Sequence, residues 1–249
     1  MTSAMRASNA WDSLLFVSAV SNVTVFEQRL LASPCIQSGQ FPLVAHFNCS
    51  SAAQALNAAL DSGPGVDWVV WVHQDVFLPE GWATRFLQAV NAAALSFTSL
   101  AVAGVYGVQG RGRDAVRAGH VLDRGCLLRE PTALPCAVDS LDELLLAVRP
   151  ASGLRLDPAL GFDFYATDLV LQAQQAGLQS IVVDACCEHW SGTPARGVVS
   201  AAVRDRIVRS ASVFEQKWQS QLPVTTPCFV IESAGDVQRF VDQFTWVSP

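Results

Sequence analysis

Short apolar runs bounded by turn residues recur along the whole chain. A continuous run without alternation is typical of a strand that is buried on both faces, and residues 68–72 (WVVWV) are the clearest example. The sequence Ser-Gly-Pro-Gly at residues 62–65 is one of the turn signals between such segments. The predicted strands cover residues 14–20, 41–47, 68–72, 99–108, 137–141, 144–149 and 180–184.

Between these runs, apolar residues recur at the spacing of one helix face. Trp82, Phe86 and Val90 give one such stripe, and Ser50 or Ser51 is the expected N-cap of another helix. The predicted helices cover residues 23–31, 51–60, 81–95, 168–176 and 198–219.

The alternation of strands and helices predicts the fold class. It indicates an α/β protein with a mainly parallel, Rossmann-like sheet and helices on both faces. The sequence has no repeat and no low-complexity linker, so we take residues 1–249 as a single domain. Residues 104–125 are rich in Gly and Arg, which predicts a mobile loop.

One stretch without any charge, residues 86–110, raises the question of a membrane span, because 51% of the chain is hydrophobic and 15% is charged. Polar residues such as Gln88 and Asn91 lower its hydrophobicity below that of a spanning helix. The stretch also divides into the end of a helix and a strand. We therefore expect no transmembrane segment, and without a signal-peptide pattern we expect a cytoplasmic protein.

The charge balance and the cysteines exclude two further classes of site. The chain has 16 basic and 22 acidic residues, a formal net charge of −6, which argues against nucleic acid as a partner. Its seven cysteines are scattered without a CxxC pair. Cys186-Cys187-x-His189 lacks a second ligand pair at usable spacing, so we expect no structural zinc.

The strongest candidate site begins directly after the strand at residues 68–72, with His73-Gln74-Asp75. Ligands of open α/β sheets bind at the carboxyl ends of the strands. A carboxylate in that crevice must be solvated, paired or bound to a metal, and cations that bind phosphates use one or two carboxylates. The alternative is a solvated turn in which Asp75 caps the next helix.

Two later segments could complete such a site. His189 lies in the sequence Glu188-His189-Trp190 after the last predicted strand, and its imidazole could bind a metal together with Asp75. The alternative is a buried, hydrogen-bonded histidine. Asp163 and Asp168 flank the start of the predicted helix at residues 168–176, where either could be a general base or Asp168 could cap the helix.

Taken in order, these motifs resemble a branch of the family 2-like glycosyltransferases in which an HQD sequence replaces the DxD motif. The resemblance covers residues 14–192. It rests on the motifs at residues 48–57, 73–82, 138–143 and 164–169 and on His189 before Ser191-Gly192.

This resemblance implies a GT-A fold, a nucleoside-diphosphate-sugar donor (UDP first among the nucleotides) and Mn2+ or Mg2+ as cofactor. It implies a hydroxyl acceptor on a glycan, a lipid-linked molecule or another compound, and leaves membrane association open. The nucleotide-sugar half would cover residues 10–110, the acceptor side residues 111–195, and a helical segment residues 196–249.

The resemblance also assigns residues to roles. The cation would bind Asp75 and His189. The sequence departs from the family's pattern at two places. His73 replaces the first acid of the DxD motif, and Tyr165-Ala166 replaces an acidic pair. Asp168 or Asp163 would therefore be the base. The expected nucleotide-sugar residues are Ser18, Ser21, Asn22, Asn48, Asn57, His73, Gln74 and Asp75. The expected acceptor or lid residues are Asp139, Asp142, Tyr165, Trp190, Arg111 and Arg113.

Two other functions are consistent with parts of the sequence. A non-catalytic nucleotide- or glycan-binding module would explain the missing acidic pair. A nucleotidyltransferase would have a similar sheet, but residues 18–22 after the first strand contain no Gly, Lys or Arg to hold a triphosphate.

Overall fold

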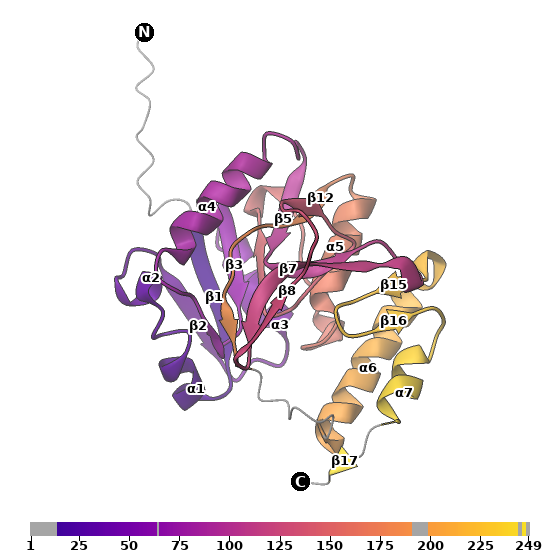
Figure 1. The fold of residues 1–249 in the computed structure, drawn as a ribbon. Coiled ribbons are helices and arrows are strands. Elements are labelled where there is room, and N and C mark those ends of the chain that lie inside the picture. Colours follow the sequence, from indigo (N-terminus) through magenta and orange to yellow (C-terminus); the bar gives the residue numbers. More distant parts are fainter. Residues whose placement is uncertain (1–13, 64, 191–198, 244–245, 248–249) are drawn as a thin grey trace.

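The structure, a computed structural model, describes residues 14–63, 65–190, 199–243 and 246–247. Its centre is a seven-stranded sheet with helices on both sides (Figure 1). The order of the strands is β2 (Leu43–Phe47), β1 (Leu14–Val20), β3 (Trp68–Val72), β11 (Leu145–Val148), β5 (Leu100–Gly104), β12 (Gln179–Val182) and β9 (Cys136–Ala137).

The strands of this sheet are mainly parallel, as predicted. β1 is parallel to β2 and β3, and β12 is parallel to β5. β11 lies antiparallel between β3 and β5, and β9 is antiparallel at the edge. Because β11 runs in the opposite direction, the residues that precede it reach the edge where β1 and β3 end.

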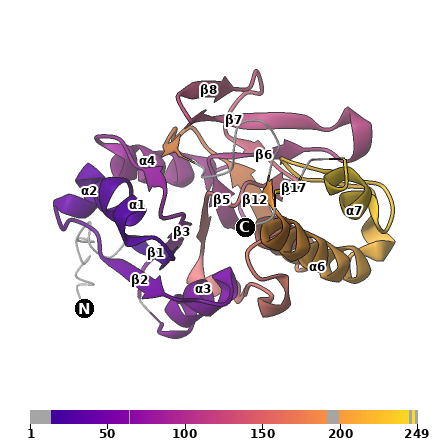
Figure 2. The same ribbon diagram turned by 90° about the horizontal axis from the view of Figure 1, so that it is seen from below.

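Two apolar layers cover the sheet, one on each face. Figure 2 shows helices on both sides of the sheet from below. Strand β3 explains the arrangement, since Trp68, Val70 and Val72 belong to one layer while Val69 and Trp71 belong to the other. The helices of the first layer are α1 (Val23–Gln28), α2 (Pro34–Gln37) and α4 (Trp82–Ala93), and those of the second are α3 (Ala52–Asp61) and α5 (Tyr165–Gln175).

Residues 104–125 are not a loop, which corrects the prediction from their Gly and Arg content. They contain two of the strands of a second, six-stranded sheet. A Cβ atom at Gly119 would collide with the carbonyl oxygen of Val105, so this glycine permits the close approach of two antiparallel strands, in which Gly119 pairs with Tyr106. The strands are β4 (Val76–Phe77), β6 (Tyr106–Gln109), β7 (Val116–Asp123), β8 (Cys126–Arg129), β10 (Ser140–Leu141) and β13 (Glu188–His189).

The C-terminal segment has a small core of its own. The residues Phe214 and Trp218 pack with Phe164 and Leu171, which ties this segment to α5. Figure 1 shows α6 and α7 side by side at the far end of the molecule from α1 and α2. The C-terminal elements are β14 (Val199–Ser200), α6 (Ala201–Lys217), β15 (Val224–Thr225), β16 (Val230–Ile231), α7 (Asp236–Val241) and β17 (Trp246–Val247).

One helix boundary differs from the prediction in a way that affects the site. Helix α5 begins at Tyr165, three residues before the predicted start at Asp168.

No helix in the described part of the chain is both long and apolar enough to cross a membrane. The 3-10 turns cover Gly112–Asp114, Pro150–Ser152, Pro158–Leu160 and Gln219–Gln221.

Candidate metal centre and crevice

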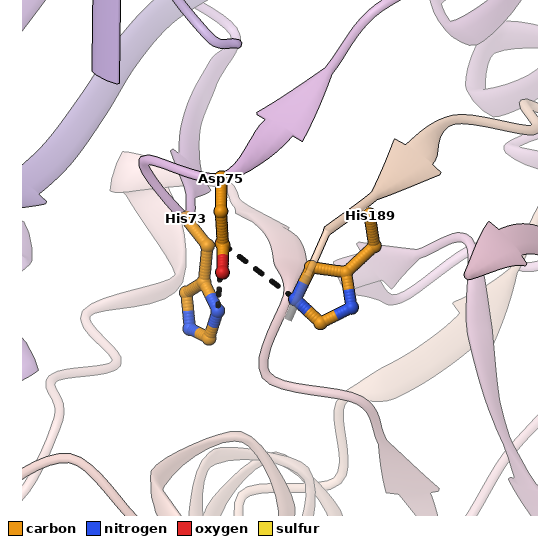
Figure 3. A group of neighbouring side chains, drawn as sticks. All are labelled: His73, Asp75 and His189. Atoms are coloured by element: carbon orange, nitrogen blue, oxygen red, sulfur yellow. Dashed lines mark ion pairs between the residues drawn. The ribbon is translucent and has the colours of Figure 1, made fainter. Parts of the chain in front are cut away.

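Three side chains with metal-binding atoms meet at the carboxyl edge of the central sheet (Figure 3). His73 and Asp75 follow β3 directly, whereas His189 comes from β13. Strand β13 pairs with β4, so that His189 lies opposite Val76 and therefore beside Asp75. The pairing continues with a hydrogen bond from the Trp190 amide to the Asp75 carbonyl (3.0 Å).

The three potential ligand atoms point toward one another. Asp75 Oδ1 lies 3.6 Å from Nε2 of His189 and 4.0 Å from Nδ1 of His73. All three ligand atoms are within 4.8 Å of each other. The sequence predicted Asp75 and His189 together, and the structure adds His73, which we had expected on the nucleotide.

The outer nitrogen of His189 is held by a carboxylate. Nδ1 of His189 lies 3.0 Å from Oδ1 of Asp123, the last residue of β7. A carboxylate accepts, so Nδ1 carries the proton and Nε2 presents its lone pair toward Asp75. Asp123 was not predicted, because it lies in the segment that we had interpreted as a loop.

The outer nitrogen of His73 is held by Tyr165. The Tyr165 hydroxyl accepts from Trp71 Nε1 (3.0 Å) and donates to the Glu143 carbonyl (3.0 Å). Nε2 of His73, 2.7 Å away, then donates to the remaining lone pair of the hydroxyl. This arrangement leaves the lone pair of Nδ1 on the side of Asp75.

The charge state of His73 agrees with this role. Burial lowers the pKa of His73 to about 4, although the neighbouring Asp75 carboxylate opposes the shift. The imidazole is therefore neutral at pH 7. Two imidazole nitrogens, each oriented by an outer partner of its ring, together with one carboxylate oxygen are a donor set that suits a divalent transition-metal ion.

A cavity of about 660 Å³ opens beside this group, between the edge of the sheet and helix α6. Its walls include His73, His189, Asp142 and Glu143. Asp142 and Glu143 lie here because they precede the reversed strand β11. The residues His73 and Leu144 are joined by a backbone hydrogen bond (2.9 Å), which extends the pairing of β3 and β11 to this point.

Asp142 and Glu143, the two acids that precede β11, are both shielded from water. Burial raises the pKa of Asp142, and it raises the pKa of Glu143 well above its usual range with help from the charges of Asp163 and Asp142. Asp142 Oδ1 accepts the Leu144 amide (3.0 Å). Glu143 Oε1 is buried and has no hydrogen-bond partner among the described residues. The sequence analysis did not name Glu143 as a site residue.

Of the two predicted bases, Asp163 lies on the cavity and Asp168 does not. Both carboxylate oxygens of Asp163 accept from Arg206 of α6, at 2.9 and 3.0 Å. Asp168 is fully buried and binds Trp218 Nε1 (2.8 Å) and Lys217 Nζ (2.8 Å). A closed carboxylate with these partners has no access to an acceptor, so Asp168 is corrected to a residue that anchors α6.

Asp139 and Arg111, which we had predicted on the acceptor side, form a structural clamp instead. The carboxylate of Asp139 accepts from the Gly110 amide (2.7 Å) and from Gln174 Nε2 (2.9 Å). Arg111 donates to Gln174 Oε1 (2.7 Å) and to the Gln221 carbonyl (3.0 Å). This clamp joins the turn after β6 to α5 and to the C-terminal segment.

Arg113, expected as an acceptor or lid residue, does not line the cavity; it is highly exposed and pairs with Glu232 on the C-terminal segment (3.3 Å). Tyr165 is fully buried, so neither face of its ring is open for stacking on a sugar. Trp190 is 38% exposed, but the Arg29 guanidinium covers one face of its ring at 4.0 Å.

The predicted nucleotide residues divide into two groups. Ser21, Asn22 and Gln74 lie together at the carboxyl edge, bound to one another. Asn48 is exposed at the end of β2. Asn57 binds the backbone of Leu156 with both its side-chain polar atoms (2.9 Å each), and Ser18 is fully buried within β1, so neither faces the crevice. Ser191-Gly192 lie outside the described residues.

Comparison with known sequences is limited. No family model matches the chain. A protein of Fuscovulum blasticum described as ATP synthase subunits region ORF 6 is 31% identical over 132 residues. The match covers 49% of this chain and 51% of that protein, so the chain spans about half the length of this relative.

Comparison with solved structures identifies the fold. A mannosyltransferase from Pyrobaculum calidifontis, solved with GDP-Man and Mn2+, is 14% identical with a TM-score of 0.50, over 87% of this chain and 66% of that one. GalNAc-T7, solved with UDP, GalNAc and Mn2+, is 10% identical with a TM-score of 0.51, over 94% of this chain and 54% of that one. Identities this low show the fold alone. The chain therefore has the GT-A fold of glycosyltransferases, as its sequence motifs predicted.

Proposed function

We propose that this protein is a metal-dependent glycosyltransferase that moves a sugar from a nucleoside-diphosphate sugar to an acceptor hydroxyl. One observation carries the proposal: His73, Asp75 and His189 converge at the carboxyl edge of a GT-A sheet, with each outer imidazole nitrogen already engaged. Two solved structures of this fold contain Mn2+ together with a nucleotide or a nucleotide sugar, which supports the same reading here.

The cation would be held by Asp75 Oδ1, His73 Nδ1 and His189 Nε2, and would stabilise the negative charge that develops on the departing nucleoside diphosphate. Mg2+ takes oxygen ligands almost exclusively, whereas imidazole is a good ligand for transition-metal ions. We therefore favour Mn2+ over Mg2+ for this site.

The acceptor hydroxyl must lose its proton during transfer, and five carboxyl groups line the cavity. Two of them are already engaged, since Asp123 is bound to His189 and Glu130 accepts from the Tyr106 hydroxyl. Both oxygens of Asp163 are occupied by Arg206, and one oxygen of Asp142 is occupied by the Leu144 amide. Glu143 keeps an oxygen without a partner among the described residues. We propose Glu143 as the proton acceptor, with Asp142 as its neighbour on the sugar.

The donor and acceptor are proposed by class. UDP is the first nucleotide to test, and the acceptor would be a glycan, a lipid-linked molecule or another hydroxyl compound. We call His73, Asp75 and His189 the metal group. The cavity between the metal group and α6 is large enough for a sugar and part of an acceptor, since ligand pockets commonly measure roughly 300–1,000 Å³.

The decisive experiment measures melting temperature with UDP, GDP and TDP, each with Mn2+ or Mg2+. A nucleoside diphosphate with Mn2+ should raise the melting temperature, Mg2+ should raise it less, and Asp75→Ala should abolish the shift. The control is Asp114→Ala, which changes an exposed aspartate away from the metal group. No shift with any nucleotide would contradict the proposal, and binding without turnover or donor hydrolysis would favour a non-catalytic module.

A further inference from the structure

Gln74 connects two loops that lie far apart in the sequence. Its Oε1 accepts the backbone amides of Ser21 (3.0 Å) and Asn22 (2.9 Å), and its Nε2 donates to the Ser21 hydroxyl (2.9 Å). Ser21 and Asn22 form the short connection between β1 and α1. One side chain therefore makes three hydrogen bonds to a segment that ends at the same sheet edge.

The position of Gln74 makes this connection informative. It occupies the turn between β3 and β4, where the Val76 amide donates to the His73 carbonyl (3.2 Å). Its neighbours on both sides, His73 and Asp75, belong to the metal group. The middle residue of the HQD sequence thus fixes the β1–α1 connection relative to the two residues that would hold the cation.

The hydrogen bonds of Gln74 also determine what the connection can offer to a ligand. The amides of Ser21 and Asn22 are both taken by Gln74, and the Asn22 side chain accepts the Val25 amide as the N-cap of α1 (3.1 Å). These backbone N–H groups are unavailable to an anion. What remains is the Ser21 O–H as a donor and the Asn22 side-chain NH2 group, which suit neutral hydroxyl and carbonyl groups.

We propose that Gln74 is a positioning residue for the nucleoside part of the donor. By holding the β1–α1 connection in place before the ligand arrives, it removes an ordering cost from binding, and it directs this connection toward the ribose and base while the metal group takes the diphosphate. The inference rests on the proposed function, because it assigns the nucleoside to the same crevice.

The test uses Gln74→Met, which keeps the side-chain length but removes all three hydrogen bonds. The affinity for UDP in the presence of Mn2+ should fall about tenfold, since each lost hydrogen bond is worth up to that factor. GDP with Mn2+ replaces UDP if UDP gives no binding. The affinity for Mn2+ alone should change less than twofold, and UMP should lose the same factor as UDP.

Two further variants isolate the contact. Ser21→Ala removes the side-chain bond to Gln74 together with the Ser21 O–H that would face the ligand, and it should weaken UDP about threefold. Gln88→Met, at an exposed position of α4, is the matched control and should have no effect. Once turnover is measurable, Gln74→Met should raise KM for the donor about tenfold and leave kcat within a factor of two.

The outcomes separate the inference from the proposed function. Unchanged UDP affinity in a folded Gln74→Met variant, or an equal loss of Mn2+ affinity, overturns the role of Gln74 and leaves the glycosyltransferase proposal standing. A loss confined to UDP and absent with UMP assigns Gln74 to the diphosphate and also overturns it. A wild-type protein that binds neither UDP nor GDP with Mn2+ overturns both.

Discussion

Acidic side chains meet nitrogen-bearing side chains at two places, the edge of the sheet after β3 and the contact between α5 and α6. The two places differ in whether the acid's hydrogen-bonding atoms are already occupied. At the α5–α6 contact, Asp168 is enclosed by Trp218 and Lys217. At the sheet edge, Asp75 has no hydrogen bond to its side chain among the described residues and faces two imidazole lone pairs. The difference teaches that a binding site is recognised by which polar atoms remain available, and less by where acids occur in the sequence.

The largest predicted effect tests the structural side of this comparison. Asp168→Ala should lower the free energy of unfolding by about 3 kcal/mol, because it leaves the buried Trp218 N–H without its acceptor and removes one of the two carboxylates that pair with Lys217. Chemical denaturation measures the loss. Affinity for Mn2+ should stay within a factor of two, and Asp168→Asn, which keeps an oxygen for Trp218, should lose less stability. A folded Asp168→Asn protein with no transfer activity would reinstate Asp168 as a base.

Next in size is the effect of Glu143→Gln on turnover. A general base typically contributes about 10²-fold or more, so kcat should fall by that factor while Mn2+ and UDP binding persist. The change is isosteric and tests proton transfer without altering the cavity. Asp142→Asn is the matched comparison at the neighbouring carboxyl. Unchanged kcat in Glu143→Gln would transfer the role to Asp142 or would indicate transfer without a conventional base.

A smaller effect is expected at the carboxylate behind His189. Asp123→Asn should weaken Mn2+ binding about tenfold, because the Nδ1 proton of His189 loses its charged acceptor and the ring is oriented less firmly. Titration with Mn2+ followed by electron paramagnetic resonance measures the affinity. Asp114→Asn is a suitable control on the exposed surface. Equal affinities of wild type and Asp123→Asn would show that His189 needs no such support.

The smallest effect concerns the clamp of Arg111 and Asp139. Arg111→Ala should reduce stability by about 1 kcal/mol, as the clamp is partly exposed and the lost hydrogen bonds are offset by solvent. Its UDP affinity should equal that of the wild type in the same binding titration. A selective loss of activity without a loss of stability would instead support the acceptor or lid role expected from the sequence.

The sequence predicted the central fold well because that fold depends on local patterns. Strands β1 and β3 have the predicted bounds, since a continuous apolar run is typical of a strand buried on both faces. The prediction of a loop at residues 104–125 was wrong because Gly was interpreted as a sign of flexibility, whereas Gly119 permits the close pairing of β7 with β6. That requirement depends on Val105 and could not be seen locally.

The metal group was predictable in part for a related reason. Asp75 and His189 each follow a strand, so their meeting at one edge could be inferred from the fold class. The support of His189 by Asp123 depends on the pairing of β13 with β7, a contact between segments far apart in sequence. The same limit explains Asp168, whose partners Lys217 and Trp218 belong to a helix that the pattern predicted without indicating where it packs.

The reversed strand β11 has one more consequence. It hydrogen-bonds to β3 along its length, and neighbouring strands lie about 4.8 Å apart. The acids that precede β11 and the ligands that follow β3 are therefore held at a separation that the backbone ladder dictates. The backbone pairing thus fixes the spacing of these two groups of side chains. Under the proposed function, substitutions in the surrounding loops would change which sugar can bind without changing this spacing.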